Sequence, residues 1–257
     1  MRKPVYAWLK FFNIKGESMD NVAVIFAGGS GARMNTKSRP KQFLEFRGKP
    51  IIIYTIELFD NHPLIDGIVV VCIESWIPFL HKMIRKFEVN KVVAVVPGGE
   101  TGQESIYNGL KAAEKHYSPE SIVLIHDGVR PLITPETITD NIESVKEFGS
   151  CITCIPATET FIINEKDGSL DIPDRSRCSI ARAPQSFILK DIMAMHERSR
   201  KEHKLDFIDS CSMMNYYGYK LHTIDGPVEN IKITTPTDYF IFKAVIDVHE
   251  NQQIFGF

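Results

Sequence analysis

The stretch VIFAGGSGARMNTKSRPKQF, residues 24–43, runs from an apolar segment into a glycine-rich turn and then into a group of cations. The cations are Arg33, Lys37, Arg39 and Lys41. A glycine-rich turn after a buried strand allows backbone N–H groups to approach an anion. Because several cations follow the turn closely, we expect an anion that carries more charge than a single phosphate.

Beyond this stretch the chain alternates between apolar runs and amphipathic segments. Buried strands are predicted over residues 22–27, 65–73, 91–99 and 121–131. Helices are predicted to follow them over residues 50–62, 76–88, 104–117 and 135–149. Strands without polar alternation, each followed by a helix, indicate an α/β fold with a mostly parallel sheet covered on both faces.

Three glycine-containing segments, AGGSGARM, PGGETGQES and HDGVRP, follow predicted strands directly. The carboxyl ends of parallel strands meet at one edge of a sheet, and ligands bind there. The three segments together therefore indicate a ligand site at this edge more strongly than any one of them does.

The pattern changes after residue 157. Residues 158–187 alternate loosely around the turn KDGS and predict a β-hairpin arm that leaves the sheet. Helices over 189–202 and 207–218, a strand over 219–226 and a closing helix over 235–250 complete the prediction. We therefore expect one domain over residues 19–257 with this arm. The first 18 residues are expected to be an N-terminal extension, since Met19 resembles a start in its own right.

Composition narrows the function classes. The chain has 257 residues, of which 44% are hydrophobic and 24% charged, as in ordinary globular proteins. A formal net charge of −2 argues against a nucleic-acid partner, which requires a basic face. No apolar run is long enough for a membrane span.

Five scattered cysteines indicate a reducing, cytoplasmic environment rather than a disulfide framework. Cys151 and Cys154 have the spacing of a redox or zinc motif, but they lie in a β-branched run that predicts a strand. Residues three apart on a strand point to opposite faces. We therefore expect buried structural thiols there.

The glycine turn does not match two common nucleotide motifs. A dinucleotide-binding fingerprint that begins at Gly29 would need a third glycine where Met34 stands, and a Walker loop would need G-K-[ST]. What remains is A-G-G-x-G-x-R-M followed by P-K-Q-F, a glycine turn that is followed by an arginine and then by a lysine. A nucleoside triphosphate attacked at its α-phosphate needs N–H donors and fixed cations of this kind.

Six segments occur together in a recognisable order: AGGSGARM, PKQF, GGETGQES, HDGVRP, PQSF and NIKITTPTD. In this combination the chain resembles the cytidylyltransferases that join CTP to a polyol phosphate, the 2-C-methylerythritol 4-phosphate and ribitol 5-phosphate enzymes. The resemblance runs from about Val22 to the final helix. It implies a Rossmann-like (GT-A-like) nucleotidyltransferase domain, a protruding arm, a homodimer through that arm, and Mg²⁺.

The resemblance also implies roles for individual residues. The glycine turn that wraps the nucleotide would consist of Ala27, Gly28, Gly29 and Gly31. The cations that stabilise the five-coordinate phosphorus would be Arg33, Lys41 and Lys232. Cytosine would be read by Gly99, Glu100 and Ser105, while ribose and the metal-bound phosphates would lie at Asp127 and Gly128. On the arm, Thr160 and Arg175 would bind the acceptor in the partner subunit's site.

The chemistry of this reaction needs no general base, because the attacking phosphate has a second pKa near 6 and is already anionic. The scattered histidines agree with that, and His126 is interpreted as a hydrogen-bonded polar group at a strand end. Asp127 is open to a role as a metal or ribose ligand or as a turn residue. Asp209 is open to a role as a helix cap or as an acceptor contact.

Three alternatives stay open at this stage. Ribitol 5-phosphate is favoured as the acceptor because Ser210 follows Asp209, where the methylerythritol enzymes commonly have an acidic residue. A dinucleotide-dependent oxidoreductase would bind NAD(P), and the broken fingerprint argues against it. A nucleotide-binding regulator would bind CTP without releasing pyrophosphate, and the intact set of Arg33, Lys41 and Lys232 argues against that.

Overall fold

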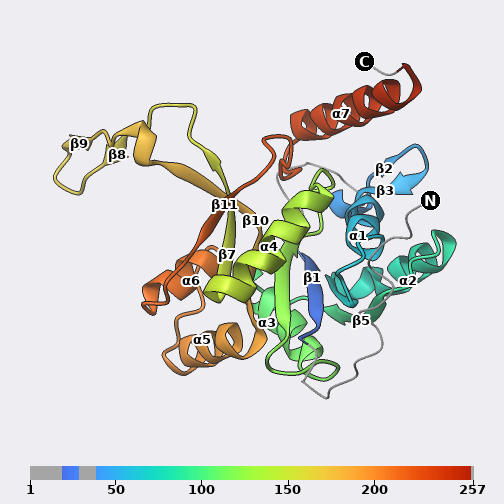
Figure 1. The fold of residues 1–257 in the computed structure, drawn as a ribbon, viewed down its shortest axis with the longest axis horizontal. Helices are drawn as coiled ribbons and strands as arrows, with labels where there is room; N and C mark the ends of the chain where they lie inside the picture. The colour runs from blue at the N-terminus through green and yellow to red at the C-terminus, as the bar shows by residue number, and fades with distance from the viewer. Residues whose placement is uncertain (1–18, 29–38, 256–257) are drawn as a thin grey trace, which may run out of the picture.

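A seven-stranded sheet forms the centre of the molecule, in the order β11-β7-β10-β6-β1-β4-β5 (Figure 1). The computed structural model describes residues 19–28 and 39–255. The strands of this sheet are β1 (Asn21–Ala27), β4 (Gly67–Cys72), β5 (Val92–Pro97), β6 (Ile122–Asp127), β7 (Ser150–Pro156), β10 (Ser179–Ile188) and β11 (Thr223–Asp225). All neighbouring pairs are parallel except the two that β10 makes with β6 and β7. The predicted mostly parallel α/β sheet is confirmed.

Helices cover both faces because β1 and its neighbours are apolar on both sides. Ala23 and Ile25 face the core beneath α1 (Ile51–Asp60), α2 (Ile77–Lys86) and α4 (Pro135–Phe148). Val22 and Val24 face a second core beneath α3 (Gly102–Ala113), α5 (Leu189–Lys201) and α6 (Ser210–Tyr216). The absence of alternation in the sequence therefore corresponds to burial on both faces.

Helix α3 lies very close to the sheet. A Cβ atom at Gly109 would be 2.6 Å from Cγ1 of Val24 and 2.7 Å from Cγ2 of Val71. Only glycine permits this approach without a shift of the helix. The N-terminus of α3 is capped by Thr101, whose side chain accepts a hydrogen bond from the backbone N–H of Glu104 at 3.1 Å.

Cys151 and Cys154 lie on β7 and are buried in the two different cores. Burial raises the pKa of the Cys151 thiol to about 12. The prediction of buried structural thiols on opposite faces is confirmed, and all five cysteines are free.

Residues 158–187, predicted as one arm, form two different elements of the fold, a projecting hairpin and a strand of the central sheet. The outer part of the arm carries the short hairpin of β8 (Ile163–Asn164) and β9 (Leu170–Asp171), followed by the 3₁₀ turn η5 (Arg175–Arg177), and it projects far from the sheet (Figure 1). From Ser179 onward, however, the chain is β10, which is paired with β7 and then with β6 inside the sheet. The residues that leave the sheet are therefore fewer than expected, because the second half of β10 is buried between two strands.

The last helix, α7 (Pro236–Phe255), packs on a third, smaller core with the hairpin of β2 (Glu45–Phe46) and β3 (Lys49–Pro50). The hydroxyl of Tyr239 donates to the backbone carbonyl of Glu45 at 2.6 Å.

Two further 3₁₀ turns are η3 (Lys41–Phe43) and η4 (Glu74–Trp76). Within the described residues, no helix combines the length and the apolar character needed to cross a bilayer. The predicted extension, residues 1–18, lies outside the described part of the chain.

Candidate active site

Gly28, the residue that follows β1, lies against the turn that follows β5, at the carboxyl edge of the sheet. A Cβ atom at Gly28 would lie 2.9 Å from Oγ of Ser105 and 3.3 Å from Cα of Gly98. The hydroxyl of Ser105 in turn accepts a hydrogen bond from the backbone N–H of Gly99 at 3.1 Å. The structure thus brings together Gly28, Gly99 and Ser105, which the sequence places far apart.

The turn η3 carries Lys41 and is fixed to the end of β1. The side-chain amide of the buried residue Gln42 donates to the backbone carbonyl of Ala27 at 2.6 Å. Phe43 stacks on Trp76, with 4.7 Å between the ring centroids. These two contacts hold Lys41 next to the strand that enters the glycine turn.

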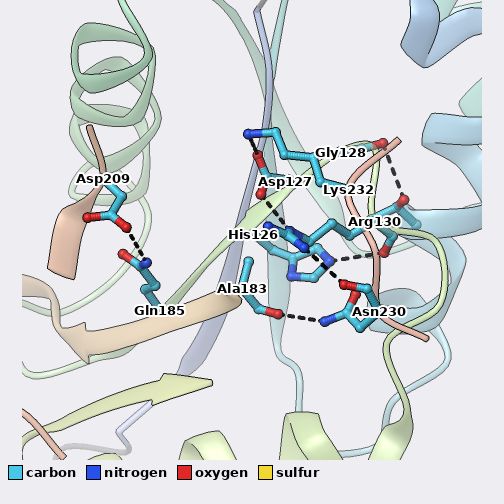
Figure 2. Close-up of polar contacts among 10 residues, drawn as sticks. His126, Asp127, Gly128, Arg130, Ala183, Gln185, Asp209, Asn230 and Lys232 are labelled. Carbon is cyan, nitrogen blue, oxygen red and sulfur yellow. Dashed lines mark hydrogen bonds and ion pairs between the residues drawn. The ribbon is translucent and has the colours of Figure 1, made fainter. Parts of the chain in front are cut away.

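Asp127 lies at the end of β6 between two cations (Figure 2). The ammonium group of Lys232 is 2.6 Å from Oδ1, and Nε of Arg130 is 2.8 Å from Oδ2. The Asp127 side chain is only 8% exposed. Burial would raise the pKa of this carboxyl group, but the positive charges of Lys232 and Arg130 outweigh burial and lower it to about 2. Asp127 is therefore an anion at every physiological pH.

Lys232 lies beside Asp127 because the backbone of its loop, residues 228–232, is held by several hydrogen bonds. Nη1 of Arg130 donates to the carbonyl of Asn230 at 2.9 Å, and the side-chain amide of Asn230 donates to the carbonyl of Ala183 on β10 at 2.7 Å (Figure 2). Nη1 of Arg182 donates to the carbonyl of Val228 at 3.0 Å. Arginines from two different segments thus fix the backbone of the loop.

A cavity of about 260 Å³ opens beside these groups. It is lined by Phe26, Gly102, Ile106, Ile125, Asp127, Arg130, Ala181, Arg182, Ala183, Gln185, Ile208, Asp209, Ser210 and Lys232. Three cationic side chains and two carboxylates therefore share one concave site at the sheet edge, the location expected for ligands in a parallel sheet.

Asp209 caps helix α6 and also lines the cavity. Its Oδ1 accepts hydrogen bonds from the backbone N–H and the hydroxyl of Ser212, at 2.8 and 2.6 Å. Its Oδ2 accepts a hydrogen bond from the side-chain amide of Gln185 at 3.0 Å (Figure 2). The helix-cap interpretation of Asp209 is confirmed, and the cavity position leaves room for the acceptor contact as well.

His126 is fully buried, and its Nε2 lies 3.1 Å from the carbonyl of Arg130. That contact requires the proton on Nε2. Burial lowers the pKa of the imidazole to about 4, so the ring is neutral. A neutral ring that donates to a carbonyl is a structural group, as predicted.

The resemblance implies Mg²⁺ at Asp127, and the residues present permit a test of that expectation. Within residues 19–28 and 39–255, no three His, Cys, Asp or Glu side chains group together as ion ligands. Asp127 supplies one carboxylate with hard oxygen donors, whose oxygens contact Lys232 and Arg130, so that an ion would take the place of one of these contacts. This donor set fits an ion held by a single carboxylate together with phosphate oxygens of a nucleotide, which is the usual arrangement for Mg²⁺.

The remaining predicted site residues lie in different surroundings or outside the described part of the chain. Gly29, Gly31 and Arg33 lie outside the described residues. Gly128 lies beside Ala27, since a Cβ at this glycine would be 2.9 Å from the alanine Cβ. Glu100 is exposed, and its backbone N–H donates to the carboxylate of Glu104 at 2.8 Å.

The two arm residues, Thr160 and Arg175, do not reach the cavity of their own chain. Thr160 is exposed, and Nη1 of Arg175 donates to the carbonyl of Thr158 at 3.0 Å. Sequence reasoning missed Arg130 and Arg182. A signal existed for Arg130, because it stands three residues after Asp127 in HDGVRP.

The site has a glycine at the end of β1, a buried carboxylate that contacts two cations, and a cavity at the edge of a parallel sheet. These features indicate an α/β nucleotidyltransferase. The comparisons with known proteins agree with this class. The IspD family model, described as 2-C-methyl-D-erythritol 4-phosphate cytidylyltransferase, matches residues 21–247. The chain therefore belongs to the IspD family of cytidylyltransferases, and the resemblance found in the sequence is confirmed.

Individual relatives fall into two groups. A ribitol-5-phosphate cytidylyltransferase from Vibrio parahaemolyticus is 54% identical over 92% of this chain and 100% of its own length. A 2-C-methyl-D-erythritol 4-phosphate cytidylyltransferase from Clostridium botulinum is 38% identical over 88% and 97%. Among solved structures, 4-diphosphocytidyl-2C-methyl-D-erythritol synthase from Anaerococcus prevotii has a TM-score of 0.75 at 27% identity, over 89% of this chain and 96% of that chain.

Proposed function

We propose that the protein transfers the cytidylyl group of CTP to a polyol phosphate and releases pyrophosphate. The observation that carries this proposal is the cavity in which Asp127, Lys232 and Arg130 meet beside the turn after β1. Such a site offers fixed cations where negative charge accumulates on phosphates. The names of the relatives support the same activity.

In this reaction an oxygen of the acceptor phosphate attacks the α-phosphorus of CTP. A new P–O bond forms, and the bond from the α-phosphorus to the bridging oxygen of the β-phosphate breaks, so that pyrophosphate leaves with the electron pair. Lys41 and Lys232, together with Arg33, would balance the charge that develops on the α-phosphate. No residue needs to remove a proton, because the attacking phosphate is already anionic at neutral pH.

Asp127, supported by the phosphates of CTP, would hold Mg²⁺. When bound, the ion neutralises phosphate charge and orients the leaving group. The turn of Ala27, Gly28, Gly29 and Gly31 would wrap the nucleotide, with Gly128 beside it. The turn of Gly99, Glu100 and Ser105 would read cytosine.

D-ribitol 5-phosphate is the acceptor we favour over 2-C-methyl-D-erythritol 4-phosphate. The relatives named for ribitol 5-phosphate are more similar to this chain, at 54% against 38% identity. The cavity wall beside Asp209 carries Ser210 rather than an acidic residue. A polyol with more hydroxyl groups fits a wall that is polar without additional negative charge.

A homodimer through the arm belongs to the same proposal. Large apolar side chains are exposed on the arm and its base, namely Phe161, Ile162, Ile163, Leu170, Ile172 and Ile180. A two-stranded hairpin is marginal in water on its own, so these side chains favour a partner surface. Thr160 and Arg175 would then bind the acceptor in the second subunit's site. A cytoplasmic location is in keeping with five free cysteines.

Pyrophosphate release tests the proposal directly. CTP, ATP, GTP and UTP are each supplied with D-ribitol 5-phosphate or 2-C-methyl-D-erythritol 4-phosphate. We expect release with CTP only, and a higher kcat/KM for ribitol 5-phosphate. A kcat/KM at least about tenfold higher for methylerythritol phosphate would overturn the choice of acceptor. CTP binding without release of pyrophosphate, for any acceptor, would indicate the regulator instead.

A further inference from the structure

Arg182 differs from the other cations of the cavity in having no carboxylate partner among the described residues. Arg130 and Lys232 both form ion pairs with Asp127. Arg182 lines the same cavity, and its Nη1 donates a hydrogen bond to the carbonyl of Val228 at 3.0 Å. A guanidinium group has several further N–H donors in a planar fork. Its positive charge is therefore available to a ligand.

The surroundings of Arg182 favour an anion. Burial lowers the pKa of its guanidinium, and the nearby positive charge of Arg130 lowers it further, against the weaker opposite effect of Glu229. An arginine remains charged under these conditions. Two neighbouring guanidinium groups at a partly buried cavity would be stabilised by a bound anion, and phosphate matches the fork of an arginine well.

The position of Arg182 in the sheet indicates which anion it meets. Strand β10 neighbours β6 on the side away from β1. The pairing of Gln185 with Ile125 and of Ile188 with Ile122 places Arg182 toward the carboxyl edge, near Asp127. Strand β1, which ends just before Gly28, lies on the opposite side of β6. A nucleotide bound at the end of β1, beside Gly28, therefore leaves the β10 side of the cavity for the second substrate.

We propose that Arg182 binds the phosphate group of the acceptor within the cavity of its own chain. The inference rests on the proposed function, because it takes the second substrate to be a phosphorylated polyol. Arg182 would contact two phosphate oxygens and leave the third to face the α-phosphorus. It would thus select phosphorylated acceptors and lower their KM, while the arm residues of a second subunit contact the same substrate from outside.

A purely structural role is the competing explanation, because Arg182 also holds the carbonyl of Val228. Loss of that anchor would loosen the loop of residues 228–232 and displace Lys232. Such a defect would lower kcat and the thermal midpoint together. Loss of a phosphate contact would instead raise the KM for the acceptor and leave the KM for CTP nearly unchanged.

The test compares Arg182→Gln and Arg182→Lys with a matched control, Arg85→Gln, which removes an exposed arginine on α2. For Arg182→Gln we expect the acceptor KM to rise about tenfold or more, as for the loss of one hydrogen bond to a charged group. The KM for CTP should stay within about threefold. Arg182→Lys should recover part of the acceptor affinity, because it keeps the charge but loses the fork.

A second readout does not depend on turnover. Inorganic phosphate is titrated while the thermal midpoint is followed, and we expect it to stabilise the wild type more than Arg182→Gln. Equal stabilisation, or an unchanged acceptor KM, would overturn the inference. A parallel fall of kcat and thermal midpoint would assign Arg182 to structure alone. Wild-type inactivity with every polyol phosphate would reject the proposed function, while the phosphate titration would still decide whether Arg182 binds this anion.

Discussion

The ammonium nitrogen of Lys232 lies 2.6 Å from Oδ1 of Asp127, so the carboxylate at the end of β6 forms an ion pair with a lysine from a loop. Asp127 is buried, whereas the Lys232 side chain is 40% exposed. The lysine is therefore the partner that has room to move. In this structure the carboxylate contacts Lys232, and a phosphate bound in the cavity would give the ammonium group a second anion to contact.

A first prediction concerns metal binding. In the absence of nucleotide, Mg²⁺ should bind weakly, because it must displace Lys232 from Asp127. Lys232→Met removes this competitor and should tighten binding of Mg²⁺ alone several-fold, by removal of an ion-pair partner. Calorimetric titration of both proteins with MgCl₂ measures the difference. Equal affinities would mean that Asp127 is not the site of the ion.

A second prediction concerns the cations of the reaction. Lys41→Ala, Lys232→Ala and Arg33→Ala should each reduce turnover with CTP by about 10²-fold or more, as when one preorganised transition-state donor is lost. Lys86→Ala, which removes an exposed lysine on α2, is the control and should retain full activity. The thermal midpoints of Lys41→Ala and Arg33→Ala should change little, whereas Lys232→Ala also removes an ion-pair partner of the buried Asp127 and should lower the midpoint. Wild-type turnover in any of the three variants would remove that residue from the mechanism.

A third prediction separates two glycines on helix α3. Gly109→Ala should destabilise the fold by about 1–3 kcal/mol, because the new methyl group would meet Val24 and Val71 at under 3 Å. Gly102→Ala is the control, since nothing lies within 4 Å of its Cβ position, and it should be neutral or slightly stabilising. Urea denaturation of both variants measures this. Similar stabilities would show that the helix shifts freely on the sheet.

A fourth prediction concerns acid sensitivity. His196 is 2% exposed, and burial lowers the pKa of its imidazole from 6.5 to about 4. Between these values the unfolded chain binds the proton and the folded chain does not. The free energy of unfolding should therefore fall as the pH drops from 6.5 to about 4, by up to about 1.4 kcal/mol per pH unit for this residue. Above pH 6.5 the residue should contribute no pH dependence.

The variant His196→Phe should flatten this slope, while His81→Gln, which alters an exposed histidine on α2, should leave it unchanged. Denaturant titrations between pH 4 and pH 7, a range chosen around the shifted and ordinary values, supply the measurement. His126 has the same direction of shift and should account for much of the slope that remains. An identical slope in His196→Phe and the wild type would contradict the prediction.

A fifth prediction concerns sharing of the site between chains. Arg175→Ala and Lys41→Ala should each be inactive alone. In a mixed dimer one site inherits both changes and the other inherits neither, so about half of the sites in such dimers should recover. Activity is measured after subunit exchange, which a fluorescent label verifies independently. A mixture that stays inactive, although exchanged and folded, would place Arg175 outside the neighbouring site.

The parallel part of the sheet was predictable because its strands are apolar on both faces. Strand β10 was not, since its buried half contains Pro184, Gln185 and Ser186. Burial of the two polar side chains depends on distant partners, since Ser186 donates to the side chain of Asn141 at 2.8 Å and Gln185 donates to Asp209. A local pattern carries no information about such partners, and the sequence alone therefore predicts these residues as part of the arm.

The site likewise contains residues that the sequence predicts and residues that it does not. Asp127 and Lys232 stand in motifs that are distinctive on their own, and both were predicted. The roles of Arg130 and Arg182 depend on the carbonyls of Asn230 and Val228, which lie far along the chain. Only the folded backbone brings those carbonyls within reach.

The base of the arm has a practical consequence for protein engineering. The backbone N–H of Ala157 donates to the carbonyl of Cys178 at 3.1 Å, and Pro156 is paired with Ser179. The arm thus begins and ends at one rung of an antiparallel ladder. We therefore expect that a tight Asn-Gly turn can replace residues 158–177 without disturbing the cavity wall on β10. Excision at that rung would give a chain without the arm, in which the proposed nucleotide binding could be measured apart from the proposed assembly of subunits.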